Sequence, residues 1–130
     1  MRPFPVVLAA AALNLCAFAE VASSEPLQGT WSGPGYVKPT DGKRETVSCH
    51  VSYSPQGSKV VAVSATCSSS STTIHQTGQL SMVTPDRYVG DFYNSEYDIS
   101  GRIRVSVSGS SQTVTFSGAR GSGSLSLSKR

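Results

Sequence analysis

The stretch that decides the fold spans residues 99–116 and reads ISGRIRVSVSGSSQTVTF. Apolar and polar residues alternate on both sides of Gly109-Ser110, which is the pattern of two half-buried strands joined by a two-residue turn. The turn sets two apolar pairs opposite one another on one face. These pairs are Val105 with Val114 and Ile103 with Phe116. The stretch therefore predicts an antiparallel hairpin with one apolar and one polar face.

Alternating segments continue in both directions from this hairpin. Downstream, a tight turn at Arg120-Gly121 predicts one more strand. Its predicted pairs are Phe116 with Leu125 and Val114 with Leu127. Upstream, alternation broken by Gly, Pro, Asn and Ser predicts five strands, and no apolar stripe of helical period persists. These five strands are expected at 28–31 or 28–37, 47–53, 61–67, 74–82 and 87–93.

Eight short strands joined in sequence within residues 29–130 predict a single all-β domain. An open sheet of this kind would leave its apolar face and its edge strands bare. Closure into an eight-stranded antiparallel up-and-down barrel buries the apolar face and pairs the two edge strands with each other. An immunoglobulin-type β-sandwich is the runner-up. That fold usually places its Trp between its two Cys, whereas Trp31 precedes Cys49 and Cys67 here.

The first residues carry a targeting pattern. Arg2 precedes an apolar run rich in Ala and Leu, and Ala17-Phe18-Ala19 ends that run with a small-x-small cleavage signature. This pattern predicts a secretory signal peptide over 1–19, a short tether over 20–28, and a periplasmic or secreted protein. The alternatives are a slightly later cleavage site, and a buried N-terminal helix in place of the leader.

The cysteines divide between the leader and the barrel. Cys16 follows Leu15 rather than the small residue that precedes a lipidated cysteine, so lipid anchoring is the less favoured alternative. Cys49 and Cys67 then remain, and an even count in an exported chain implies a disulfide. Pairing them keeps both on the apolar face and leaves a hairpin loop of ordinary length at 56–60.

Composition narrows the classes of partner. Charged residues make up 15% of the chain, and the formal net charge of +3 becomes +2 once Arg2 is removed with the leader. That basic excess is too small to indicate the positively charged surface of a nucleic-acid-binding protein. The sequence has no uninterrupted apolar run of the roughly 18 residues that a membrane helix needs. We therefore expect no nucleic-acid partner and no stable membrane span. We also expect the protein to be a monomer.

The chain lacks the elements of a familiar active site. Ser is abundant, but no Gly-x-Ser-x-Gly elbow occurs. His50 and His75 fall at outward strand positions, and the close ligand pairs that zinc prefers are missing. Acidic residues cluster around one hairpin, where solvated carboxylates are ordinary. They are Asp91, Glu96 and Asp98. We expect no enzymatic activity, no catalytic residues, no metal and no cofactor.

Aromatic residues are the candidates for the barrel lumen. Alternation places four of them on the inward face, namely Tyr53, Tyr88, Phe92 and Phe116. Glycines at 78, 90 and 101 share that face and could leave room for a small apolar ligand. Because residues 20–130 make only a small barrel, a filled core is the favoured interpretation over an open pocket.

The two ends of the predicted barrel carry a family resemblance. Gly29-Thr30-Trp31 opens the first strand and Lys129-Arg130 closes the last. This arrangement resembles the calycin superfamily of lipocalin and avidin-like barrels. The resemblance implies that a basic side chain of the last strand, Arg130 or Lys129, packs across the indole of Trp31. Gly29, Trp31 and Arg130 would then be structural residues at one barrel end.

A second resemblance concerns residues 27–67. The Gly-x-Trp motif followed by a Cys–Cys hairpin is similar to bacterial periplasmic protease-inhibitor barrels, which block metalloproteases or serine proteases. It implies a protein target, with residues 20–28 as an extended trunk that enters a protease cleft.

Several spaced motifs also resemble those of small exported proteins of alphaproteobacteria. They are Trp31-Ser32-Gly33-Pro34-Gly35, Gly42-Lys43-Arg44-Glu45, Cys49-His50-Val51-Ser52-Tyr53 and Cys67-Ser68-Ser69. This resemblance implies location and fold, and it brings no activity with it. The expected function is therefore that of an exported, non-catalytic barrel that binds a protein target such as a protease. The alternatives are a carrier of a small apolar ligand in the lumen and a structural protein of the cell envelope.

Overall fold

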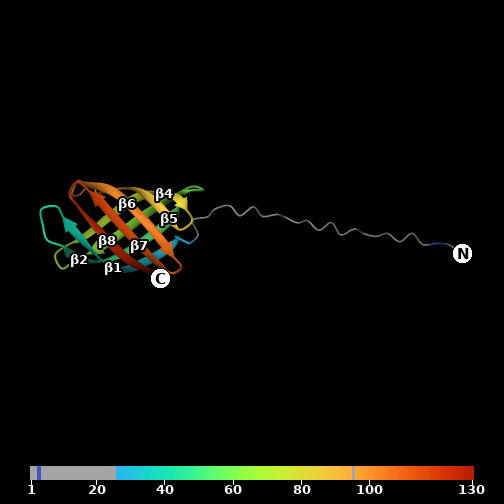
Figure 1. Ribbon diagram of the computed structural model, residues 1–130, viewed down its shortest axis with the longest axis horizontal. Coiled ribbons are helices and arrows are strands. Elements are labelled where there is room, and N and C mark those ends of the chain that lie inside the picture. Colours follow the sequence, from blue (N-terminus) through green and yellow to red (C-terminus); the bar gives the residue numbers. More distant parts are fainter. Residues whose placement is uncertain (1–2, 4–25, 95) are drawn as a thin grey trace.

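The computed structural model describes residues 3, 26–94 and 96–130 (Figure 1). The predicted signal peptide, apart from Pro3, and residues 20–25 of the predicted tether lie outside the described residues. The described chain forms eight strands. They are β1 (Gly29–Pro39), β2 (Glu45–Pro55), β3 (Val60–Ser68), β4 (Thr73–Thr84), β5 (Arg87–Asn94), β6 (Ile99–Ser108), β7 (Ser111–Gly118) and β8 (Gly121–Lys129).

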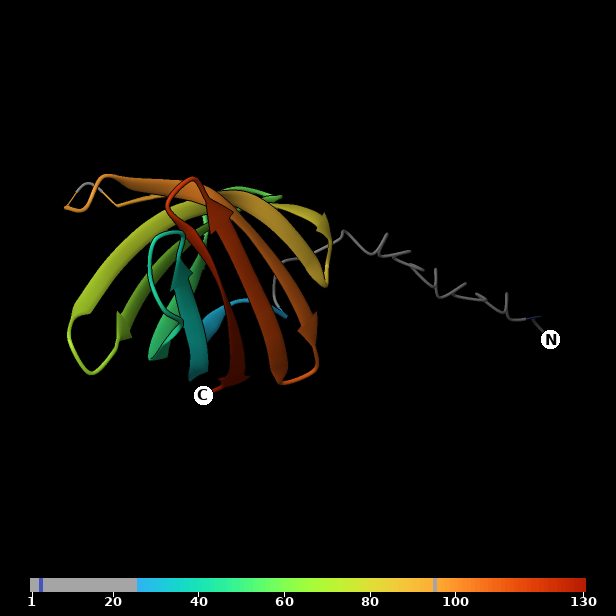
Figure 2. The same ribbon diagram turned by 60° about the vertical axis from the view of Figure 1, so that its left-hand side comes forward.

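The strands form one closed antiparallel barrel, as the sequence predicts. Each strand pairs with the next in the chain, and β8 pairs with β1 to close the sheet. Figure 2 shows the strands wrapping around a common interior. Within the described part of the chain, no helical segment has the length and apolarity that a membrane crossing needs.

The connecting loops define two ends of the barrel. We call one end the mouth, and it carries the loops after β1, β3, β5 and β7. The other end is the base, which carries the loops after β2, β4 and β6 and the start of β1. The distinction matters because the interior differs between the two ends.

Two of the predicted hairpin registers are confirmed. Cys49 lies opposite Cys67, and the two residues form a disulfide. Val105 lies opposite Val114 across a two-residue turn whose first residue, Gly109, has a φ of 60°. In each hairpin the turn and the inward apolar pairs agree, which is why alternation alone is sufficient there.

The predicted register between β7 and β8 is wrong by two residues. Phe116 lies opposite Gly123 rather than Leu125, and Val114 lies opposite Leu125. The turn is at 119–120, because Gly121 belongs to β8 and packs closely against the backbone of β1. A shift of two residues preserves the inward face, so the alternation pattern could not reveal it.

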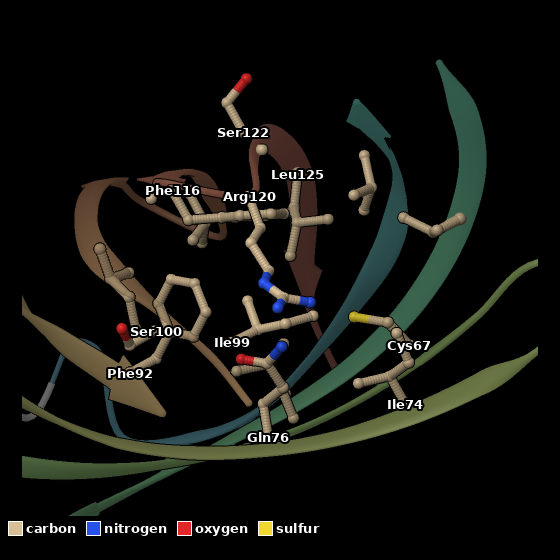
Figure 3. A pocket seen from close by; sticks show the side chains of 18 of the residues that line it. Cys67, Ile74, Gln76, Phe92, Ile99, Ser100, Phe116, Arg120, Ser122 and Leu125 are labelled. Atoms are coloured by element: carbon tan, nitrogen blue, oxygen red, sulfur yellow. The ribbon is translucent and has the colours of Figure 1, made fainter. Parts of the chain in front are cut away.

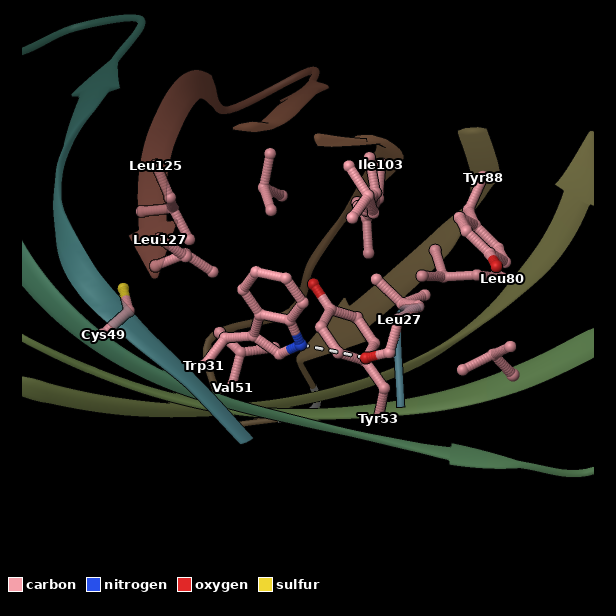
Figure 4. Packing of buried hydrophobic residues seen from close by; sticks show 14 of the residues in the cluster. Leu27, Trp31, Cys49, Val51, Tyr53, Leu80, Tyr88, Ile103, Leu125 and Leu127 are labelled. Carbon is pink, nitrogen blue, oxygen red and sulfur yellow. Dashed lines mark hydrogen bonds between the residues drawn. The ribbon is translucent and has the colours of Figure 1, made fainter. Parts of the chain in front are cut away.

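The base of the barrel is a packed apolar core. Trp31, Tyr88, Leu80 and Leu127 are all at most 2% exposed there, and Leu27 is fully buried among them (Figure 4). The Trp31 indole Nε1 donates a hydrogen bond to the Leu27 carbonyl oxygen at 2.9 Å. Leu27 therefore belongs to the core, although the sequence places it in the tether.

Candidate ligand site

The mouth half of the barrel interior encloses a cavity of about 580 Å³. All eight strands contribute to its wall, and its lining extends to the mouth loops at 40–44, 69–72 and 119–120. None of the base loops lines it. The barrel is thus solid at the base and hollow toward the mouth.

The wall of the cavity is mainly apolar (Figure 3). Aliphatic side chains from seven strands form most of it. They include Val37, Val51, Val63, Ile74, Ile103, Val114 and Leu125. Such a surface favours an apolar ligand, because a bound molecule would remove it from water.

The predicted lumen residues separate by depth. Tyr53, Phe92 and Phe116 line the cavity, whereas Tyr88 packs in the base and is absent from the lining. The Tyr88 hydroxyl donates to the Pro85 carbonyl oxygen at 3.0 Å, at the base loop after β4. The expectation of a filled core is therefore wrong for the mouth half of the barrel, which is open.

Glycines explain how the aromatic rings leave this space. A Cβ atom on Gly101 would lie 2.8 Å from Cε1 of Phe92, and one on Gly123 would lie 2.2 Å from Cζ of Phe116. Each ring therefore lies over the glycine directly opposite it on the next strand. The two rings meet edge to face, with centroids 6.1 Å apart. Retraction of both rings against the wall keeps the centre of the mouth half open.

A buried polar pair lies where the cavity meets the base. The Tyr53 hydroxyl donates to Oε1 of Gln112, and both residues are almost completely buried. Desolvation raises the pKa of Tyr53 well above its ordinary value, so this phenol stays neutral. Nε2 of Gln112 has no hydrogen-bond partner among the described residues. Sequence reasoning did not single out Gln112, which occupies an inward position between apolar neighbours.

The expected barrel-end contact is present, and of the two basic residues expected for it Lys129 makes it and Arg130 does not. Nζ of Lys129 lies 5.6 Å from the centroid of the Trp31 ring, which is within cation–π range. Arg130 instead lies on the outer side, where its Nε donates to Oγ of Ser32. Lys129 directly faces Trp31 in the register between β1 and β8, so it shares the inward face that Arg130 does not.

The mouth carries polar and charged groups. Arg120 and Gln76 both point into the cavity in Figure 3, and both line it. Glu45 lies at the rim and accepts a hydrogen bond from Oγ of Ser71 at 2.7 Å. Hydrogen bonds from Ser71 and then Ser69 lower the pKa of Glu45 below its ordinary value, so this carboxylate is ionised at neutral pH.

The residues weighed for catalysis are dispersed over the outer surface. His50 and His75 are both exposed on strand faces, and Nδ1 of His75 lies 2.9 Å from Oγ1 of Thr66. The Tyr93 hydroxyl donates to Asp98 at 3.4 Å, near the acidic hairpin. Within residues 26–94 and 96–130, no three His, Cys, Asp or Glu side chains form a metal-binding group.

No known protein family matches this chain, and no curated protein sequence matches it. Solved structures of designed β-barrels are similar to it. A redesigned β-barrel, mFAP1, bound to DFHBI superposes with a TM-score of 0.68 at 17% identity, over 83% of this chain and 99% of that one. A de novo designed fluorescence-activating β-barrel superposes with a TM-score of 0.64 at 18% identity, over 85% of this chain and 99% of that one. At these identities the likeness shows the fold alone.

Proposed function

We propose that this protein binds one small apolar molecule in the lumen of its barrel and carries it unchanged. The observation behind this proposal is the apolar cavity of about 580 Å³. Its volume falls within the roughly 300–1,000 Å³ of ordinary small-molecule sites. An eight-stranded barrel is also just wide enough to hold one small ligand.

The comparison with designed barrels supports the proposal. The redesigned barrels mFAP0 and mFAP1 are both described as bound to DFHBI, and each covers at least 80% of this chain. An interior of this architecture is therefore compatible with a bound small molecule. The chemical class of the ligand of this protein must be inferred from the residues that line its own cavity.

Two expectations from the sequence, that the protein is exported and that it binds a protease, stay predictions. The export signal at 1–19 lies outside the described residues, apart from Pro3. The trunk expected at 20–28 is described only at 26–28, and there Leu27 is buried in the base rather than extended. Lumen binding by a periplasmic or secreted barrel is consistent with both the leader and the fold.

A matched pair of substitutions on β3 tests lumen binding. Ala65 lines the cavity, whereas Ala62 is on the same strand at an outward position and does not line it. Ala65→Phe would place a ring in the open space, and Ala62→Phe would add the same ring outside the barrel. The readout is titration with the neutral apolar dye N-phenylnaphthylamine, whose emission rises in an apolar site.

We expect Ala65→Phe to weaken dye binding at least about tenfold, because the ring occupies the volume that the dye would fill. Ala62→Phe should bind the dye as the unsubstituted protein does. Urea denaturation of both variants, followed by the emission of the single tryptophan, checks that each is folded. If Ala65→Phe fails to fold, the smaller Ala65→Leu replaces it. Equal dye affinity for folded lumen variants and the unsubstituted protein would exclude the lumen as the site.

A further inference from the structure

We infer that the natural ligand is an apolar carboxylic acid, whose chain occupies the lumen and whose carboxylate binds Arg120 at the mouth. This inference rests on the proposed function. It adds the chemical class of the ligand. The volume of the cavity and the polarity of its wall do not determine that class by themselves.

Arg120 is held where it can meet a ligand. It belongs to the two-residue loop between β7 and β8, and the Thr40 amide donates to its carbonyl oxygen at 3.1 Å. That bond ties two mouth loops together and fixes the backbone from which the side chain extends. Figure 3 shows the guanidinium pointing into the cavity, while the residue as a whole is exposed at the mouth.

No residue that the structure describes neutralises the guanidinium of Arg120. Its side chain makes no hydrogen bond or ion pair with any other residue in the described part of the chain. A second basic residue of the mouth loops, Arg44, is engaged elsewhere, because its guanidinium stacks on the Tyr36 ring at 3.8 Å from the ring centroid. Arg120 therefore leaves a full positive charge, with all five N–H donors, at the entrance to an apolar cavity.

The charges around the mouth limit what the headgroup can be. Asp41 and Glu45 also line the rim, and Glu45 is already held by Ser71. These two carboxylates would repel any anionic headgroup, and they would repel one with two or more negative charges more strongly than a single carboxylate. A single carboxylate matches the planar fork of Arg120, which can bind both of its oxygens. The Gln76 amide, on the wall of the same cavity, supplies a further neutral donor.

The experiment compares two probes that differ only in the headgroup. Dodecanoate and dodecanol share one apolar chain, and each is used to displace N-phenylnaphthylamine from the barrel at neutral pH. The test variant is Arg120→Gln. The matched control is Arg104→Gln, which removes an equal charge from an exposed outward position on β6.

We expect Arg120→Gln to weaken dodecanoate binding about tenfold, the scale of one lost charge-assisted contact at a partly exposed site. Dodecanol binding should not change, and Arg104→Gln should change neither. If dodecanoate and dodecanol both bind but Arg120→Gln affects neither, the inference fails and lumen binding stands. If neither probe displaces the dye and Ala65→Phe leaves dye binding unchanged, the proposed function itself fails.

Discussion

Tyr53 connects the packed base to the hollow mouth. Its ring lines the cavity, and its hydroxyl donates to Gln112, which is 3% exposed. A phenol in this setting loses its solvation if it ionises and has no cation to compensate for the charge. The cause of its raised pKa is therefore burial, in the same way that a buried carboxyl is kept neutral.

The first prediction concerns the titration of the tyrosines. In an alkaline titration followed by phenolate absorbance, we expect a late phase that Tyr53→Phe removes. Tyr97→Phe, which changes an exposed tyrosine, should leave that phase in place. A titration with no late phase, or one that is unchanged in Tyr53→Phe, would contradict the burial of this hydroxyl.

The same shift determines how stability depends on pH. The folded protein keeps the Tyr53 proton at a pH where the unfolded chain has lost it, because the folded pKa lies above the unfolded one. The free energy of unfolding therefore falls as the pH rises above about 10, the ordinary pKa of tyrosine. Tyr88 adds to the trend, since desolvation and then the charge of Asp86 raise its pKa as well. Urea midpoints measured across this range should decrease less in Tyr53→Phe.

At the scale of elements, the contact between β7 and β8 depends on a glycine. A Cβ atom on Gly123 would lie 2.2 Å from Phe116 and 2.5 Å from the Tyr36 carbonyl oxygen. Phe116 can move only if it turns into the cavity, and the Tyr36 carbonyl is part of the β1 backbone. We predict that Gly123→Ala lowers the free energy of unfolding by about 2 kcal/mol, as overpacking usually does.

The control for this prediction is Gly57→Ala in the loop between β2 and β3. A Cβ atom there would come no closer than 3.9 Å to another side chain, and its stability should change by less than about 0.5 kcal/mol. Urea denaturation measures both variants. Equal midpoints for the two would show that the ring of Phe116 does not lie over Gly123.

The strand pattern was predictable because alternation and turn residues agree along most of the chain. Alternation separates inward from outward positions, but it does not give height along the barrel axis, which depends on strand tilt and stagger. Tyr88 and Phe92 therefore looked equivalent on β5, although Tyr88 packs in the base and Phe92 borders the cavity. Cavity volume was unpredictable for the same reason, because it depends on which large residue faces which glycine.

Arg120 was beyond sequence reasoning for a different reason. Its place between two predicted strands made it a turn residue, and turn residues usually point into solvent. The direction of its side chain depends on the loop conformation, which the Thr40 amide helps to hold. Leu27 was missed likewise, because one apolar residue outside the alternating pattern carries no periodic signal.

For the whole molecule, closure of the sheet removes the free strand edges. β1 and β8 pair with each other, so every described strand has two neighbours. Because edge pairing is the usual route by which sheets associate, we predict a monomer in solution. Sedimentation equilibrium at micromolar concentration should give the mass of one chain. A stable dimer would show that another surface, such as the exposed Tyr93 and Tyr97 near the mouth, drives association.

The seam between β1 and β8 also constrains the order of events in the cell. Because β1 is the first strand and β8 the last, a ribosome must complete nearly the whole barrel before the seam can form. Until then the nascent chain has two strand edges whose backbone groups are unpaired, and its apolar interior cannot pack stably. Were the predicted signal peptide to direct export, this delay would keep the chain unfolded for a translocation channel that threads an extended polypeptide. Closure by the last strand thus couples the completion of synthesis to the onset of stable folding.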